Sequence, residues 1–323
     1  MERVLVTGGA GFIGSHLCEA LLEKGYLVGC FDNFSTGRLD NIISLEEKFG
    51  YGKCKIFIRR GDVNNSSSPL RKLFYDLNPD YVFHYAATVG VKRVLEDPFA
   101  SLQDIEGIKN ILKLSLEYKV KKVIFASSSE VYGESPELPQ KEDGILNPLL
   151  SYGAVKLIGE YFCQAYYKKY DLPTCALRFF NVYGPRQEGS DYGFVVSIFL
   201  NQILRGEQPT VFGDGGQTRD FTYVSDNIEA ALLAMESEKA NGQIFNVGTG
   251  KQTTILDLAR KIIGISGNDL EPKFMPPRSG FEITDRLPDV SKIKEILGFE
   301  PKINLNEGLM RTNDYFRKHT KGD

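Results

Sequence analysis

Short apolar runs alternate with longer amphipathic stretches through the first half of the chain. The runs are rich in β-branched residues and apolar throughout, as is typical of strands buried on both faces of a parallel sheet. They predict strands at residues 3–6, 27–31, 55–59, 81–85, 123–126 and 174–177. Helical spacing is clearest at residues 11–24, 101–118 and 152–169. This alternation predicts an α/β fold built on a doubly wound parallel sheet of the Rossmann type.

The pattern changes after residue 181. Glycine and proline interrupt a looser region, a strand-like run returns at residues 244–247, and a helix is indicated at 255–263. We therefore predict two domains. The first covers residues 1–180, with a return segment near 221–250. The second is a smaller C-terminal α/β domain that combines residues 181–220 and 251–323.

Composition narrows the classes of partner. The 323 residues are 42% hydrophobic, which is enough to bury a core without disulfides, and the net charge is −3. This charge argues against a nucleic acid or an anionic membrane as partner, because both need a basic surface. We expect Lys119, Lys121 and Lys122 to lie on the solvated surface.

The location is predicted to be cytoplasmic. The five cysteines include no CxxC pair, and an odd number of scattered thiols suits a reducing compartment. No basic-then-apolar leader and no apolar run of membrane-spanning length is visible.

Histidine chemistry is improbable. The three histidines, His16, His84 and His319, have no metal-ligand spacing and do not suggest a Ser-His-Asp triad. We expect no metal, and catalysis by tyrosine, lysine, carboxylates or a cofactor.

A glycine-rich turn follows the first strand. Residues 7–14, TGGAGFIG, lie between a predicted strand and a predicted helix, which is the context that a dinucleotide-binding turn requires. Glycines allow the tight turn and let backbone amides approach a diphosphate at the helix N-terminus. The predicted contacts in this turn are Gly8, Gly11, Phe12, Ile13 and Gly14.

Carboxylates at the next strand ends indicate which dinucleotide binds. Asp32 ends the second strand, where a carboxylate accepts hydrogen bonds from both ribose hydroxyls and repels a 2′-phosphate, so NAD is favoured over NADP. Asp62 follows the third strand, where it either binds the adenine amino group or caps the strand end. The other predicted cofactor contacts are Asn33, Val63, Ala86 and Ala87.

Tyr152 and Lys156 form the candidate catalytic pair. Their i, i+4 spacing places them on one helical face, where an ammonium lowers a tyrosine pKa toward neutrality and makes the phenol a usable base. The spacing alone is not specific, because Tyr51–Lys55 and Tyr118–Lys122 share it. The Tyr152 helix, however, follows a strand-end serine cluster at residues 127–129, where the active groups of open parallel sheets gather.

Together these motifs resemble an extended short-chain dehydrogenase/reductase of the nucleotide-sugar epimerase/dehydratase group. Further matches are HYAA at 84–87, FNVYGPR at 180–186, GDGGQTRD at 213–220, FNVGTG at 245–250 and LGFEP at 297–301. The resemblance covers nearly the whole chain. It implies NAD as cofactor, a nucleotide-diphosphate sugar as substrate, and a homodimer that pairs the helices at 101–118 and 152–169.

The resemblance also implies a shared first step. Tyr152 takes the proton of the sugar 4-hydroxyl, Ser128 hydrogen-bonds the same oxygen, and hydride leaves carbon 4 for NAD. Lys156 bonds the nicotinamide ribose. The implied substrate contacts are Ser128, Ser129, Asn181, Phe212, Arg219, Arg278 and Arg286.

Members of the group diverge after the 4-keto sugar forms. Ser129 lowers the probability of a thymidine-type 4,6-dehydratase, which usually has aspartate there. Glu130, a further candidate catalytic residue, is unusual for a simple 4-epimerase. The Ser129–Glu130 pair resembles UDP-glucuronate decarboxylases and GDP-mannose dehydratases, and Arg286 looks like an arginine found in decarboxylases. By contrast, residues 184–187 followed by 192–197 look like a 4-epimerase. We rank UDP-sugar 4-epimerase first, UDP-glucuronate decarboxylase second and 4,6-dehydratase third. A reductase that exchanges free cofactor, or a non-catalytic dinucleotide sensor, leaves the second-domain motifs unexplained.

Overall fold

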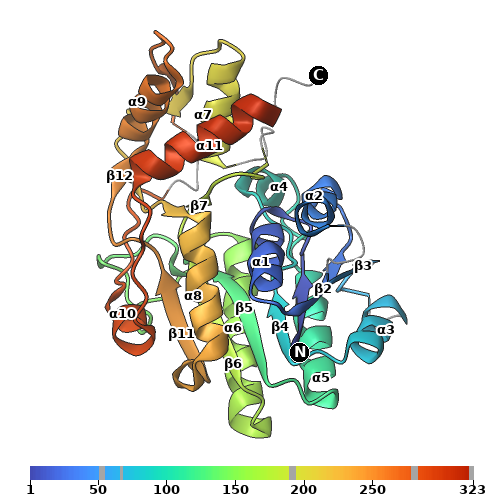
Figure 1. Ribbon diagram of the computed structural model, residues 1–323. Coiled ribbons are helices and arrows are strands. Elements are labelled where there is room, and N and C mark those ends of the chain that lie inside the picture. Colours follow the sequence, from blue (N-terminus) through green and yellow to red (C-terminus); the bar gives the residue numbers. More distant parts are fainter. Residues whose placement is uncertain (51–54, 66–67, 189–193, 278–282, 320–323) are drawn as a thin grey trace.

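A seven-stranded parallel sheet forms the centre of the structure, a computed structural model that describes residues 1–50, 55–65, 68–188, 194–277 and 283–319 (Figure 1). The strand order is β11-β6-β5-β4-β1-β2-β3. The strands are β1 Arg3–Thr7, β2 Leu27–Asp32, β3 Ile56–Arg60, β4 Tyr81–His84, β5 Lys122–Ser128, β6 Thr174–Phe179 and β11 Gln243–Val247. The predicted doubly wound fold is confirmed, and the six strands predicted in the first half occur with ends shifted by one or two residues.

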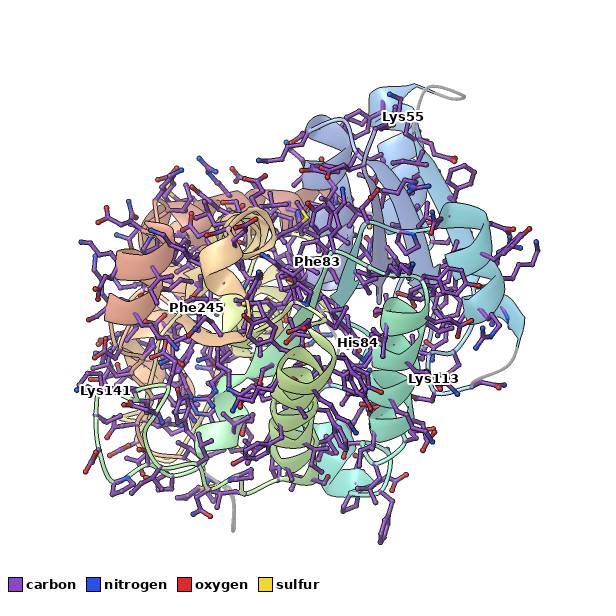
Figure 2. The ribbon with its side chains drawn as sticks, turned by 90° about the horizontal axis from the view of Figure 1, so that it is seen from below. Lys55, Phe83, His84, Lys113, Lys141 and Phe245 are labelled. Carbon is purple, nitrogen blue, oxygen red and sulfur yellow. The ribbon has the colours of Figure 1, made fainter. Side chains whose placement is uncertain are left out.

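Helices cover both faces of this sheet and form two apolar cores. On one face α1 (Phe12–Glu23) packs against α8 (Val224–Glu236), with α2 (Asp40–Phe49) beside it. On the other face lie α3 (Ser68–Leu77), α5 (Asp104–Glu117) and α6 (Ser151–Tyr170). The second view places Phe83 and Phe245 in the interior and Lys55, Lys113 and Lys141 at the periphery (Figure 2). Two-sided burial explains why the middle of these strands is mainly apolar, whereas polar residues lie mostly at or near the strand ends.

A second group of elements lies beyond the carboxyl ends of the strands (Figure 1). Its helices α7, α9 and α11 pack on one another. Their bounds are Val195–Leu204, Ile255–Ser266 and Leu305–His319. Short strand pairs join it: β7 (Val182–Tyr183) with β10 (Thr222–Tyr223), β8 (Thr210–Phe212) with β13 (Lys273–Met275), and β9 (Thr218–Arg219) with β12 (Thr253–Thr254).

Smaller elements complete the described chain. They are α4 (Val91–Glu96), the 3-10 turns η1 (Ser129–Tyr132) and η2 (Glu238–Ala240), and α10 (Ser291–Leu297), which packs on β11. None of the helices in the described ranges is long and apolar enough to cross a membrane.

The prediction for Lys122 is wrong. This residue is buried, and its Nζ donates to the carbonyl oxygens of Ala234, Met235 and Ser237 at 3.1, 3.1 and 2.6 Å. These carbonyls lie at and just beyond the C-terminal end of α8, where an ammonium is favourable. Lys122 therefore joins β5 to α8.

Candidate active site

The glycine turn after β1 is packed so closely that it has no room for side chains at Gly8 and Gly14. Gly8 has φ +70°, and a Cβ there would lie 2.8 Å from the backbone nitrogen of Ala86. A Cβ on Gly14 would lie 2.1 Å from the carbonyl oxygen of Gly8, and the amide of Gly11 donates to that same oxygen at 3.1 Å. The turn opens directly into α1, which begins at Phe12 and continues with Ile13. This geometry fits a dinucleotide diphosphate approached by backbone amides.

Asp32 lies buried at the end of β2 and braces the same turn. Its two carboxylate oxygens accept from the amides of Ala10 and Phe34, at 2.9 and 2.7 Å. A carboxylate held in this way is already oriented before a ribose arrives, and it leaves lone pairs for hydroxyl donors.

The adenine-side residues lie together at the ends of β2 and β3. Asp62 accepts from Asn33 Nδ2 at 3.3 Å and from the amide of Asn64 at 2.8 Å. Val63 is buried, and its carbonyl accepts from Asn110. Asp62 therefore caps the loop that follows β3, and it also lines a pocket with Gln103 and Glu106.

The segment after β4 completes the cofactor end. The amide of Ala86 donates to Thr7 Oγ1 at 3.3 Å, and Ala87 follows it. The amide of Thr88 donates to Asp104 Oδ2 at 2.7 Å. Asp104 begins α5 and was not predicted as a site residue; α5 lies beside α6, which brings its carboxylate near Lys156.

Tyr152, Lys156 and Ser128 meet where α6 begins above the end of β5. Lys156 is buried, donates from Nζ to the carbonyl oxygen of Ala126 at 2.6 Å, and lies 5.5 Å from the centre of the Tyr152 ring. The Ser128 side chain lies close enough to Tyr152 to lower its pKa. Ser128 Oγ accepts from the amide of Glu130 at 3.2 Å. The structure thus brings together the three residues that the sequence assigned to proton transfer.

The predicted lowering of the Tyr152 pKa is not found in this state. Burial raises the pKa of Tyr152 well above 10, and Ser128 opposes this only in part. Burial also lowers the pKa of Lys156 to about 8, against an opposing effect of Asp104. Sequence spacing indicates proximity, but desolvation of both groups decides the direction of the shift.

Arg286 lies beside the serine cluster. Its Nη1 donates to Ser129 Oγ at 2.8 Å and to Glu130 Oε1 at 2.7 Å. Although burial alone would raise it, Arg286 holds the pKa of Glu130 below its usual range. The arginine is 3% exposed, and its Nε and Nη2 are buried without a partner among the described residues. Unpaired buried guanidinium donors are costly, so these two nitrogens are placed to receive an acceptor from a ligand.

The remaining predicted substrate residues come from the second group of elements. Asn181 Nδ2 donates to the carbonyl oxygen of Asp220 at 3.0 Å. Phe212 ends β8 and is half-buried. Arg219, in β9, donates to the carbonyl oxygen of Thr218 at 2.7 Å and acts electrostatically on Glu130. Arg278 lies outside the described residues.

A buried polar frame that the sequence reasoning missed lies behind the catalytic pair. We define it as Glu160, Arg178, Tyr132 and Asn246. Arg178 donates to both carboxylate oxygens of Glu160, at 2.9 and 2.7 Å, and to Tyr132 Oη at 2.7 Å. Tyr132 donates in turn to Asn246 Oδ1 at 2.7 Å. Two features of the sequence could have indicated this frame. Arg178 is a charged residue inside an otherwise largely apolar strand, and Glu160 is a glutamate four positions beyond Lys156.

The frame extends to the segment that carries Arg286. Asn246 Nδ2 donates to the carbonyl oxygens of Gln140 and Asp289, at 2.9 and 3.1 Å. Gln140 pairs with Pro288, two residues beyond Arg286. At its other end Glu160 accepts from Ser127, next to Ser128. The frame therefore connects both groups of candidate catalytic residues.

Comparison with known proteins identifies the family of this chain. The GDP-mannose 4,6 dehydratase family matches residues 5–312. The chain is 38% identical to a UDP-glucose 4-epimerase of Mycolicibacterium smegmatis, over 99% of this chain and 100% of the relative. It is 37% identical to a UDP-N-acetyl-alpha-D-glucosaminuronate decarboxylase of Bacillus cytotoxicus, over 98% of each chain. The crystal structure of UDP-glucose 4-epimerase from Thermotoga maritima, with UDP-glucose, superimposes with a TM-score of 0.90 at 38% identity, covering 98% of this chain and 99% of that one.

Fold and site together define an NAD-dependent enzyme of nucleotide-sugar metabolism. The chain belongs to the epimerase/dehydratase family of extended short-chain dehydrogenases/reductases, whose members include 4-epimerases, decarboxylases and dehydratases. The cofactor is NAD, as in solved neighbours. The glycine turn and Asp32 fit this cofactor, which supplies a hydride acceptor when bound.

Proposed function

We propose that this protein is an NAD-dependent UDP-sugar 4-epimerase that acts through a transient 4-keto sugar. The observation that carries the proposal is the meeting of Tyr152, Ser128 and Lys156 at the cofactor end of the sheet. Full-length similarity to UDP-glucose 4-epimerases supports the choice of substrate class.

The chain's own residues divide the work. The Tyr152 phenol exchanges a proton with the sugar 4-hydroxyl, and Ser128 hydrogen-bonds the same oxygen. Lys156 stabilises the phenolate, which burial by itself disfavours. Epimerisation further requires that the keto sugar turn over and take hydride back on its other face.

A specific observation supports a second activity, decarboxylation of a UDP-uronate. Arg286 presents two buried unpaired nitrogens beside Glu130 and Ser129. A planar guanidinium suits a carboxylate, and the 4-keto form of a uronic acid is a β-keto acid that loses carbon dioxide readily. The similarity to a sugar-uronate decarboxylase agrees with this reading.

A panel of UDP-sugars with product masses separates the two. The holoenzyme is incubated with UDP-glucose, UDP-N-acetylglucosamine and UDP-glucuronate. An isobaric product that chromatography resolves from its substrate establishes epimerisation, whereas loss of carbon dioxide from UDP-glucuronate establishes the second activity. Loss of water or no reaction on every substrate rejects both.

The variant Glu130→Ala gives a second way to distinguish 4-epimerisation from decarboxylation. In a plain 4-epimerase this variant keeps most of its activity. If Glu130 acts in proton transfer, turnover falls by about 10²–10⁴-fold while NAD content stays normal. The melting temperature, measured in parallel, separates this from loss of the Arg286 ion pair.

We also propose a homodimer formed through α5 and α6, and a substrate domain made of residues 181–220 and 251–323. Tyr161 and Phe162 on α6 are 62% and 48% exposed, an apolar surface that a partner helix would bury, with Tyr166 beside them. A monomeric mass by light scattering at micromolar concentration contradicts the dimer.

A further inference from the structure

The five residues 184–188, which we call the strap, connect the second group of elements to the cofactor end. They follow β7 and run over α1 (Figure 1). Arg186 donates from Nη2 to Glu19 Oε2 at 2.7 Å and from Nη1 to Ser15 Oγ at 3.5 Å. Ser15 directly follows Gly14, so the strap is fastened to the first turns of the helix that seats the NAD diphosphate.

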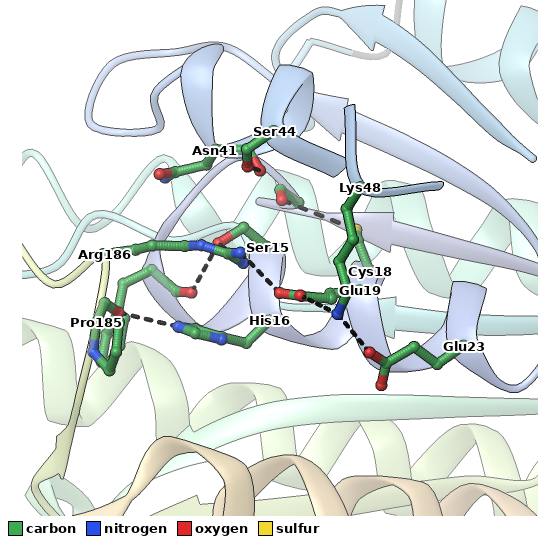
Figure 3. A network of polar contacts seen from close by, with 12 residues as sticks. Ser15, His16, Cys18, Glu19, Glu23, Asn41, Ser44, Lys48, Pro185 and Arg186 are labelled. Atoms are coloured by element: carbon green, nitrogen blue, oxygen red, sulfur yellow. Dashed lines mark hydrogen bonds and ion pairs between the residues drawn. The ribbon is translucent and has the colours of Figure 1, made fainter. Parts of the chain in front are cut away.

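Neighbouring residues reinforce this attachment (Figure 3). His16 Nε2 donates to the carbonyl oxygen of Pro185 at 2.9 Å. Glu19 also accepts from Lys48 of α2 at 2.7 Å. Lys48 and Arg186 thus hold one carboxylate from opposite sides, and the Arg186–Glu19 pair is mostly withdrawn from solvent.

A second ion pair fastens the far end of the strap. Arg93 donates from Nη2 to Glu188 Oε1 at 2.8 Å and from Nη1 to Oε2 at 3.3 Å, a two-pronged contact. Arg93 lies on α4, which follows the Ala86–Ala87 segment of the cofactor end. Since β1 and β4 are neighbours in the sheet, the two fastenings lie on the elements that follow adjacent strands.

Backbone geometry indicates that these bonds hold the strap in place. Arg186 has φ +65°, a strained conformation that side-chain-bearing residues rarely adopt. The strap keeps this conformation while Arg186 is bonded to Glu19 and Ser15. Breaking that contact removes the restraint on a strained turn.

We propose that the strap retains the cofactor: the Arg186–Glu19 and Glu188–Arg93 pairs hold it over the NAD seat, and NAD leaves only when they open. A reaction cycle that returns the hydride it has taken benefits from a cofactor that stays bound. The inference rests on NAD as cofactor and not on the sugar reaction proposed above.

The test is the rate of NAD release from the holoprotein, read by chromatography of the nucleotide after rapid dilution and filtration. Arg186→Met and Glu188→Gln are each expected to speed release about tenfold, as loss of a partly buried charge pair acts mainly on dissociation. The double variant is expected to exceed either single variant.

Lys24→Met is the matched control. It removes a cation at the C-terminal end of α1 and breaks the Lys24–Glu236 pair, which joins this end of α1 to α8 without touching the strap. Release at the wild-type rate from both strap variants overturns the proposal, as does equal acceleration by Lys24→Met. If Arg186→Met does not fold, Arg186→Lys and wild-type protein at raised salt carry the test, and faster release is expected in both.

Discussion

The buried polar frame and the strap use the same chemical groups in opposite ways. In the frame, the Arg178–Glu160 pair is about 1–2% exposed and each charge has several partners. In the strap, the pairs are 13–32% exposed and lie between elements that follow different strands. A fully buried ion pair costs free energy to form and more to break, whereas a partly exposed pair separates at a small cost in free energy.

This difference teaches where the molecule needs fixed geometry and where it needs release. In the frame, Glu160 accepts a hydrogen bond from Ser127. Ser127 precedes Ser128 on β5, and Glu160 lies one turn beyond Lys156 on α6, so this bond fixes the spacing of the proton-transfer groups. The strap has to open so that NAD can bind, and then close so that NAD is retained. Four predictions test whether the two networks differ as described.

The largest expected effect is on folding when the frame loses a charge. Arg178→Met leaves Glu160 as a buried carboxylate without its counterion and is expected to cost about 3–5 kcal/mol of unfolding free energy. Urea denaturation of the holoprotein measures it. Adding Glu160→Gln to this variant should recover part of the loss, and a cost no larger than that of Arg186→Met would refute the comparison.

Next in size is the pH dependence of Lys156. Its pKa falls from 10.5 when unfolded to about 8 when folded, so below pH 8 its buried charge opposes folding. The unfolded chain binds more protons between pH 8 and 10.5, and the contribution of Lys156 to stability rises across that window by a total of about 3 kcal/mol. The difference in unfolding free energy between wild type and Lys156→Met should show this slope. A difference that stays flat with pH rejects it.

A smaller effect is expected from Tyr132→Phe, which removes one hydroxyl from the frame. Arg178 loses an acceptor and Asn246 a donor, at a cost of about 1–3 kcal/mol. We expect kcat to fall with little change in KM, because the catalytic groups shift while the substrate contacts remain. Tyr183→Phe, whose hydroxyl meets the carbonyl of Leu305, is the control. Equal kinetic loss in both variants would mean that the frame has no positioning role.

The smallest effect is expected at the rim of the strap. Lys48→Met breaks contacts with Glu19 and Glu23, but the lysine is half exposed. The cost should stay below about 1 kcal/mol and shrink as salt is added. If the loss of unfolding free energy exceeds this value and persists in molar salt, the ion pairs of the strap and of the frame do not differ in the way described.

Local patterns predicted the sheet and the cofactor turn. Buried parallel strands must be apolar along their length, and a diphosphate turn must be glycine-rich, so both are visible in a few consecutive residues. The Tyr152–Lys156 pair was found in the same way, from helical spacing next to a strand end.

What depends on distant elements was missed or wrongly predicted. Arg178 and Glu160 lie 18 positions apart, and only the packing of α6 on β6 joins them. Lys122 was predicted to be solvated like Lys121, although its side chain reaches the end of a helix more than a hundred residues later. The direction of the Tyr152 pKa shift likewise depends on burial, which spacing does not reveal.

The position of β11 makes the two halves of the molecule inseparable. It arrives after residue 240 yet pairs with β6 along the whole of that strand, from Gln243 with Cys175 to Val247 with Phe179. A fragment that stops at residue 180 would leave β6 as a largely apolar edge strand with unpaired backbone donors and acceptors, a template for aggregation. A recombinant protein in which the second half is replaced therefore needs a replacement that also supplies the strand that pairs with β6.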